Sequence, residues 1–247
     1  MLSNEKTSQQ LILDFPARPE FSFDNFIVSE SSRFAVEAAG EICSPSPPFR
    51  SLFLFGPGGL GKTHLLISIG NRVSQTGKRA LYLHCREWIQ KLNAGGGIPD
   101  AQTLNRITAV DYFLLDDVEY LSGQKGAQEQ LYLIYNQLAE REARLVFASS
   151  LHPHDLPSIQ DYLISRFQWG MVVELGPIDA EGMARILKKL AADRGMNLPG
   201  RTIEYLLTRI PRDFASLNAV VETINRESLV QKKKVSIALA KDALNLP

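Results

Sequence analysis

Residues 56–63 read Gly-Pro-Gly-Gly-Leu-Gly-Lys-Thr, and this stretch decides the fold. It matches the pattern G-x-x-x-x-G-K-[ST] of a phosphate-binding loop, which is informative only between a strand and a helix. Both neighbours are present, because the apolar run 52–55 precedes the loop and HLLISIGNRV, residues 64–73, follows it with apolar residues at helical spacing. The sequence therefore predicts a P-loop that binds a nucleotide.

The residue types in this loop explain how it would hold phosphate groups. Its glycines let backbone N–H groups turn inward, where the positive end of the following helix also points. Lys62 would supply a charge to the β- and γ-phosphates, and the Thr63 hydroxyl is placed to bind Mg²⁺. The predicted cofactor-binding residues are Gly56, Gly58, Gly59, Leu60, Gly61, Lys62, Thr63 and His64.

A pair of carboxylates further along the chain completes the predicted magnesium site. YFLLDDVEYL, residues 112–121, is an apolar strand that ends in Asp116 and Asp117. An Asp-Asp pair alone is common, but downstream of a complete P-loop it indicates the second half of a nucleotide site. We expect Asp116 to bind Mg²⁺ through water beside Thr63, and Asp117 to orient or activate the attacking water. The expected cofactors are ATP or ADP with Mg²⁺.

Short apolar runs alternate with helical patterns over the middle of the chain. The expected strands are 52–55, 80–84, 112–115, 145–148 and 171–175. Helical spacing lies between them, and after Pro177 only four helices are expected, at 180–194, 201–209, 214–232 and 237–244. This order predicts an α/β fold in which a parallel five-stranded sheet with flanking helices is followed by a small helical lid. The expected domains are a flexible tail, 1–20, a nucleotide-binding domain, 21–175, and a lid domain, 176–247.

Composition narrows the class of protein. The chain has 247 residues, and its 27 Lys and Arg residues balance its 27 Asp and Glu residues, which argues against a large basic face for DNA. Cys43 and Cys85 have no metal-ligand spacing and fit a reducing compartment. The N-terminus lacks the layout of a signal peptide, and no apolar run reaches membrane-spanning length. We expect a cytoplasmic protein without a membrane partner.

The tail contains one apolar hexapeptide, Gln10-Leu11-Ile12-Leu13-Asp14-Phe15. Two interpretations are open. The segment packs back on its own domain as an edge strand or staple, or it is a tethered anchor for another protein. In the second case Leu13 and Phe15 would fill an apolar pocket while Gln10 hydrogen-bonds at its edge.

Four stretches resemble a known family, and the resemblance covers roughly residues 21–246. FSFDNFIVSESSRFAVEAA, GPGGLGKTHLL, VDYFLLDDVEYLSG and LISRFQWGMVVEL are similar to the AAA+ core of the bacterial replication initiator DnaA. DnaA continues into a DNA-binding domain, whereas this sequence stops where the family's lid ends, so no sequence-specific DNA binding is expected. A DnaA-like ATPase module of this kind resembles the Hda group, the regulatory inactivators of DnaA.

The resemblance also implies a partner for the tail. Members of the Hda group carry an N-terminal motif, Gln-Leu-x-Leu-x-hydrophobic, that docks in the sliding clamp of DNA polymerase III. The hexapeptide fits this form, which implies that the clamp-binding residues are Gln10, Leu11, Leu13 and Phe15.

The family also implies a role for one arginine and two departures from its pattern. Arg166 in LISRFQWG matches the arginine finger, which would act in trans on ATP held by DnaA. The alternative is an ion pair with Glu174 or Asp161 inside the fold. Ser150 and Ala215 stand where the family has its two sensor residues, and neither carries a charge. We therefore expect nucleotide binding with weak intrinsic hydrolysis, the chain acting mainly as an ATPase activator of DnaA.

These sequence features are compatible with three functions to different degrees. The first is a regulator that binds the clamp through its tail, stimulates hydrolysis of DnaA-bound ATP and so prevents re-initiation of replication. The second is a helicase-loader-like AAA+ ATPase acting on single-stranded DNA, which the neutral charge and the short, Gly-interrupted segment 86–108 disfavour. The third is a self-contained P-loop enzyme with a small-molecule acceptor, which leaves the tail and the lid unexplained. A homo-oligomer that hides Arg166 is a further expectation, because AAA+ interfaces work between neighbours.

Overall fold

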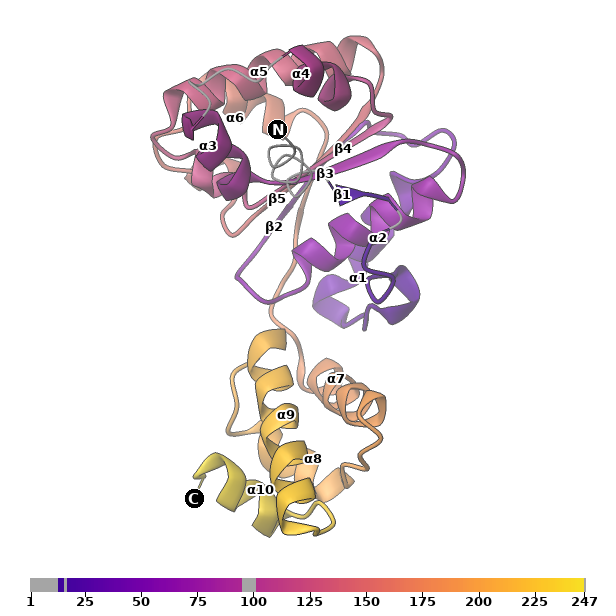
Figure 1. The fold of residues 1–247 in the computed structure, drawn as a ribbon, viewed down its shortest axis with the longest axis vertical. Helices are drawn as coiled ribbons and strands as arrows, with labels where there is room; N and C mark the ends of the chain where they lie inside the picture. Colours follow the sequence, from indigo (N-terminus) through magenta and orange to yellow (C-terminus); the bar gives the residue numbers. More distant parts are fainter. Residues whose placement is uncertain (1–12, 16, 95–100, 247) are drawn as a thin grey trace, which may run out of the picture. The chain divides into compact units, whose positions relative to one another are not determined.

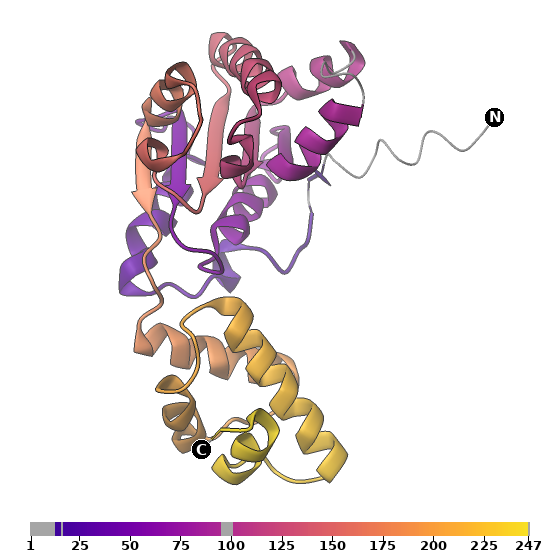
Figure 2. The ribbon, with the colours of Figure 1, turned by 90° about the vertical axis from the view of Figure 1, so that its left-hand side faces the viewer.

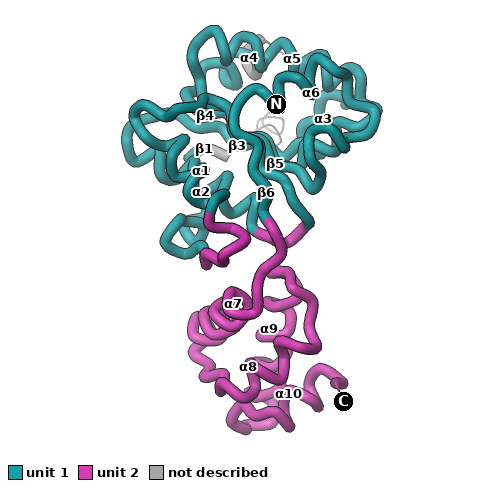
Figure 3. The backbone as a smooth tube through the Cα atoms, turned by 180° about the vertical axis from the view of Figure 1, so that it is seen from behind, with its two compact units in different colours: residues 1–26, 34–57, 61–175 teal, residues 27–33, 58–60, 176–247 magenta. Residues whose placement is uncertain are grey.

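A computed structural model of the chain describes residues 13–15, 17–94 and 101–246. It divides into two compact units, coloured teal and magenta in Figure 3. The first unit runs to Leu175 but omits two short segments, Ile27–Arg33 and Gly58–Leu60, which belong with Gly176–Pro247 in the second unit.

A six-stranded sheet forms the centre of the first unit (Figure 1). Its strands, in spatial order, are β1 (Leu13–Asp14), β3 (Ala80–His84), β4 (Tyr112–Asp116), β5 (Arg144–Ser149), β2 (Ser51–Phe55) and β6 (Met171–Glu174). Strands β2 to β6 pair in parallel, which confirms the predicted five-stranded parallel sheet. Every residue of β4 is buried, as expected of a central parallel strand covered on both faces.

Helices cover both faces of this sheet (Figure 2). Alternate strand residues, among them Phe53, Phe113 and Phe147, pack with side chains of α3, α5 and α6 in one core cluster. Helix α2 contacts β3, β4 and β5, and nine of its residues are buried. The helices of the unit are α1 (Arg33–Glu41), α2 (Lys62–Ser74), α3 (Cys85–Ala94), α4 (Ala101–Thr108), α5 (Lys125–Glu140) and α6 (Asp161–Gln168). The short 3₁₀ turns of this unit are η1 (Phe23–Asn25), η3 (Val118–Leu121) and η4 (Pro153–Asp155), and η2 (Glu30–Ser32) lies in the second unit.

The sheet gains an edge strand from the N-terminal segment. Leu13 pairs with Tyr82 and Asp14 with Leu81, so β1 runs antiparallel to β3. The ring of Phe15 then lies on α2 at Gly70, where an added Cβ would stand 2.1 Å from Phe15 Cζ. Residue 70 must therefore lack a side chain for the ring to sit there. The structure thus gives Leu13–Phe15 the edge-strand arrangement that was one of the two interpretations of the hexapeptide.

The chain that follows β1 is fixed by one asparagine of α2. The Asn71 side-chain oxygen accepts from the backbone N–H of Ala17 at 2.7 Å, and its Nδ2 donates to the carbonyls of Ala17 and Phe21 at 2.7 and 2.8 Å. These hydrogen bonds use both the donor and the acceptor of the buried Asn71 amide, and a buried amide left without partners would lower the stability of the fold. Arg18 adds a cation–π contact, its guanidinium lying 5.9 Å from the ring centroid of Phe21.

The second unit is helical, and the predicted helices match its elements closely. They are α7 (Ala180–Asp193), α8 (Gly200–Leu207), α9 (Phe214–Gln231) and α10 (Ile237–Leu244). Three of them begin at a side chain that accepts a backbone N–H of the first turn, namely Asp179, Asp213 and Ser236. None of the helices in the described part of the chain is long and apolar enough to cross a membrane.

Candidate functional site

The phosphate-binding loop joins β2 to α2, as the sequence predicts. Gly61 stands at the N-cap of α2 with a φ of 100°, a conformation that L side chains rarely adopt. A Cβ at this position would also lie 2.6 Å from Phe26 Cε2. Both constraints require glycine here. The loop therefore leads directly into the unsatisfied N–H groups at the start of a helix, which form an anion site.

Lys62 is buried beneath this loop, with 6% of its surface exposed. Its Nζ donates to the carbonyl of Gly56 at 2.6 Å and to that of Pro57 at 3.0 Å. Burial lowers the pKa of the amine, while nearby carboxylates, Glu119 first among them, act in the opposite direction. The amine is thus held at the loop by two backbone carbonyls, close to where a phosphate would lie.

Asp116 ends β4 and is 1% exposed. Its Oδ2 accepts from Thr63 Oγ1 at 2.6 Å and from Tyr82 Oη at 2.9 Å, and its Oδ1 accepts from the N–H of Asp117 at 3.1 Å. The hydroxyl and the carboxylate expected to bind Mg²⁺ are therefore side by side, and their donor chemistry fits this ion.

Asp117 follows with a left-handed backbone, φ 54° and ψ 52°, which starts η3. Its Oδ2 lies 3.1 Å from His84 Nε2. Burial raises the pKa of Asp117 to about 6, and the neighbouring carboxylates of Asp116 and Glu119 contribute to the same shift. Such a carboxylate is ionised at neutral pH yet basic enough to accept a proton or orient water, which suits the role predicted for it.

Three further residues belong to this cluster and were not predicted. Tyr82 and His84 come from β3, and Glu119 comes from η3. Glu119 Oε1 accepts from the N–H of Ser150 at 3.1 Å, while its Oε2 is buried with no hydrogen-bond partner among the described residues. The sequence contained one signal for His84, because this residue ends the expected strand 80–84. In the structure, His84 is in register with Asp116 of the neighbouring strand. Polar residues at the carboxyl ends of parallel strands gather at one edge.

The remaining predicted loop residues have other neighbours. His64 Nε2 lies 2.9 Å from the carbonyl of Ser22, and its ring packs edge-on against Phe21 and Phe26. The His64 side chain thus contacts the N-terminal segment, and only the backbone N–H of His64 is placed to contribute to phosphate binding at the loop. In the second unit, Gly59 accepts through its carbonyl from the N–H of Phe214 at 3.0 Å.

The two sensor positions stay without a charged side chain. Ser150 follows β5, and its backbone N–H is used by Glu119. Ala215 is exposed in the first turn of α9. Neither residue supplies a charge that would distinguish a γ-phosphate.

Arg166 lies in the last turn of α6. Arg166 forms no ion pair with Glu174 or Asp161. Instead the guanidinium lies over three aromatic rings. No hydrogen bond or ion pair joins it to Lys62 or Asp117 within the described ranges of the chain.

Of the residues predicted to bind the clamp, Gln10 and Leu11 lie outside the described residues. The backbone of Leu13 belongs to β1, and Phe15 packs at Gly70. Among the residues that are described, no group of three or more His, Cys, Asp or Glu side chains is arranged to hold a metal ion.

The parallel sheet in this strand order, the loop between β2 and α2, the paired aspartates after β4 and the helical second unit define a P-loop protein of the AAA+ class. Comparisons with known proteins identify the family within this class. A family model described as the bacterial DnaA ATPase domain matches residues 17–174, and one described as the lid domain of Hda matches residues 179–244. The chain belongs to the family of bacterial DnaA ATPase domains and has an Hda-type lid.

Solved structures agree with this assignment. Domain III of the Thermotoga maritima replication initiation protein DnaA is 30% identical, with a TM-score of 0.86 over 93% of this chain and 98% of that one. A replication initiator DnaA bound to AMPPCP and single-stranded DNA is 30% identical, with a TM-score of 0.75 over 87% of this chain and 68% of that one. The Thermotoga maritima RuvB Holliday junction branch migration motor, 17% identical with a TM-score of 0.69 over 91% of this chain and 71% of that one, shares the fold alone.

Proposed function

We propose that this chain binds ATP or ADP with Mg²⁺ and regulates replication initiation by stimulating hydrolysis of ATP bound to DnaA. Binding at the loop is supported by the Thr63 hydroxyl, which lies 2.6 Å from the Asp116 carboxylate, beside the buried amine of Lys62. A related DnaA binds the nucleotide analogue AMPPCP. Because Ser150 and Ala215 carry no charge, the chain's own hydrolysis is expected to be slow, and bound nucleotide would act mainly on its conformation.

The single observation that supports the regulatory role is that no carboxylate pairs with the Arg166 guanidinium, at least among the residues that the structure describes. An arginine finger needs this freedom, because it acts on a phosphate held by a neighbouring subunit and raises hydrolysis about 10³- to 10⁵-fold. In this proposal the neighbour is DnaA, whose ATPase domain shares the fold of this chain.

The hexapeptide 10–15 would tether the chain to the sliding clamp. Leu13 and Phe15 already have places on the chain's own sheet and helix. Clamp binding therefore requires that β1 detach, and the free energy of detachment reduces the apparent affinity. Once bound, the tether would raise the effective concentration of the chain near DnaA on clamp-loaded DNA.

The test mixes the protein with ATP-loaded DnaA, with and without clamp loaded on DNA, and follows conversion of bound ATP to ADP. Conversion is expected with the loaded clamp, and Arg166→Ala should abolish it. Arg141→Ala is the matched control, because Arg141 is an exposed arginine of the same unit. It should leave conversion unchanged.

The clamp part of the proposal needs its own variant. Gln10→Ala combined with Leu11→Ala should remove clamp binding and clamp-dependent conversion. The melting temperature is measured beside it, and a large loss would mean that the segment is part of the fold. Conversion that proceeds equally without clamp would remove the tether from the proposal and leave the role of Arg166 intact.

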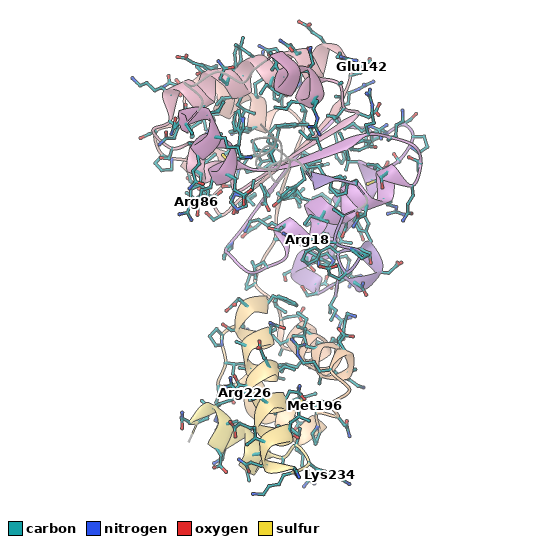
Figure 4. All side chains as sticks on the ribbon, in the orientation of Figure 1. Arg18, Arg86, Glu142, Met196, Arg226 and Lys234 are labelled. Atoms are coloured by element: carbon teal, nitrogen blue, oxygen red, sulfur yellow. The ribbon has the colours of Figure 1, made fainter. Side chains whose placement is uncertain are left out.

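One observation supports the alternative, a helicase-loader-like ATPase acting on single-stranded DNA. In the segment 86–108, the residues up to Ala94 belong to α3, and Ala101–Thr108 form α4. Arg86 of α3 is exposed (Figure 4), and its guanidinium lies 5.6 Å from the ring centroid of Tyr120. A DnaA relative binds single-stranded DNA. Micromolar binding of an oligonucleotide that is lost with Arg86→Ala, without any effect on DnaA-bound ATP, would favour this alternative.

A further inference from the structure

The surroundings of the Arg166 guanidinium are aromatic. Its Cζ lies 5.6 Å from the ring centroids of Tyr132 and Tyr135 and 5.7 Å from that of Trp169. All three distances fall within the range of cation–π attraction, about 6 Å. We call these three rings the aromatic cradle.

Few hydrogen bonds hold the guanidinium. Nη2 lies 3.5 Å from Asn136 Oδ1, at the outer limit of a hydrogen bond. Nε is buried and has no partner among the described residues. An arginine offers five N–H donors in a fixed fork, so most of the donor capacity of Arg166 is not used by the residues that the structure describes. Its position is therefore set mainly by the rings.

The rings of the aromatic cradle differ in exposure, since Tyr135 is buried and Trp169 is exposed. Tyr135 is 2% exposed within the core, and its hydroxyl donates to the carbonyl of Arg166 at 3.5 Å. Tyr132 is braced by the edge of Tyr162, with ring centroids 4.8 Å apart. Trp169, directly after α6, is 65% exposed although it is the largest side chain of the cradle.

A carboxylate would hold the arginine differently from these rings. It would neutralise the positive charge and would compete with any incoming phosphate for the same N–H donors. The face of an aromatic ring attracts the cation without removing its charge or occupying its fork. A cradle of rings therefore orients the guanidinium and keeps it available for an anion from another molecule.

We infer that Tyr132 and Trp169 are positioning residues for Arg166, which hold its guanidinium in place for a phosphate of the partner's nucleotide. This inference rests on the proposed function, in which Arg166 acts in trans. A displacement of about 1 Å in a catalytic group can reduce a rate on the order of 100-fold. Loss of one ring should accordingly reduce the maximal rate of hydrolysis of DnaA-bound ATP about 10- to 100-fold, with less effect on the concentration of this chain at half-saturation.

The experiment titrates full-length Trp169→Ala and Trp169→Phe against ATP-loaded DnaA with loaded clamp, and measures the maximal rate and the half-saturating concentration separately. Trp169→Ala should lower the maximal rate, and Trp169→Phe should restore most of it because it keeps an aromatic face. Tyr132→Leu and Tyr132→Phe form a second pair with the same expectation. The melting temperature of each variant shows whether the fold is retained.

The outcomes separate this inference from the proposed function. If Arg166→Ala has no effect, the proposed function fails and the inference fails with it. If Arg166→Ala abolishes stimulation while Trp169→Ala and Tyr132→Leu keep the full maximal rate, the inference alone is overturned. A half-saturating concentration that rises at unchanged maximal rate would also overturn it, since Trp169 would then be a docking contact.

Discussion

Replacing Asp117 with asparagine should stabilise this protein above pH 6 and have no effect near pH 4. The pKa of Asp117 is raised to about 6, from an ordinary value of 3.8, by burial and by Asp116 and Glu119. A raised carboxyl pKa means that the folded state binds the proton more tightly than the unfolded state. Stability is therefore lost as the pH rises through the window from about 4 to 6.

The size of the effect follows from this shift after a correction for solvent. Two pKa units correspond to roughly 3 kcal/mol. The Asp117 side chain is 33% exposed, so solvent screening reduces the figure to about 1–2 kcal/mol. In a protein of this size that equals about 2–8 °C in melting temperature. Asparagine also tolerates the left-handed backbone at this position, so the substitution adds no backbone strain to the measured difference in stability.

The assay is thermal or urea unfolding of Asp117→Asn and the parent protein from pH 4 to 8, without nucleotide or Mg²⁺. Asp155→Asn, which removes an exposed carboxylate, is the control and should show no pH-dependent gain. The same stability difference at pH 4.5 and pH 8, or a loss at pH 8, would refute the reasoning. Adding Mg²⁺ and ATP should shrink the gain, because the cation would offset the carboxylate charges.

Three other predictions concern the same unit. Lys62→Ala should weaken binding of a fluorescent ATP analogue by more than about 100-fold, because it removes a charge-assisted contact to phosphate. Tyr82→Phe should lower the free energy of unfolding in urea by about 1–1.5 kcal/mol, because Asp116 loses a buried donor. Gly70→Ala should displace the Phe15 ring and raise amide hydrogen exchange at residues 13–15. The melting temperature of Gly70→Ala should change little, since the lost contact is offset by about 1 kcal/mol of helix propensity.

Much of the fold could be predicted because its signals are local. The ranges predicted for the lid helices from their helical patterns agree with the structure to within one residue at most ends, and in the structure Asp179, Asp213 and Ser236 cap three of them. The five parallel strands were found as short apolar runs because both of their faces are covered. The P-loop was found because its glycines and Lys62 are adjacent in sequence.

Other features depend on residues that are far apart in the sequence. Strand β1 is two residues long and pairs with Tyr82 and Leu81, which lie 69 and 67 residues further along the chain, with no turn to indicate a hairpin. The contact of Phe15 with Gly70 is equally remote. The aromatic cradle needs rings from α5 and from the residue after α6, and periodicity alone would have assigned these rings to the core.

The edge strand β1 has a further consequence for handling the protein. While Leu13–Asp14 are in place, they satisfy backbone groups of β3 that would otherwise face solvent at the end of the sheet. Unpaired strand edges are templates for pairing with another chain. A preparation shortened to begin after residue 15 would expose this edge. It should then show concentration-dependent aggregation, even though the nucleotide-binding loop and the lid are untouched.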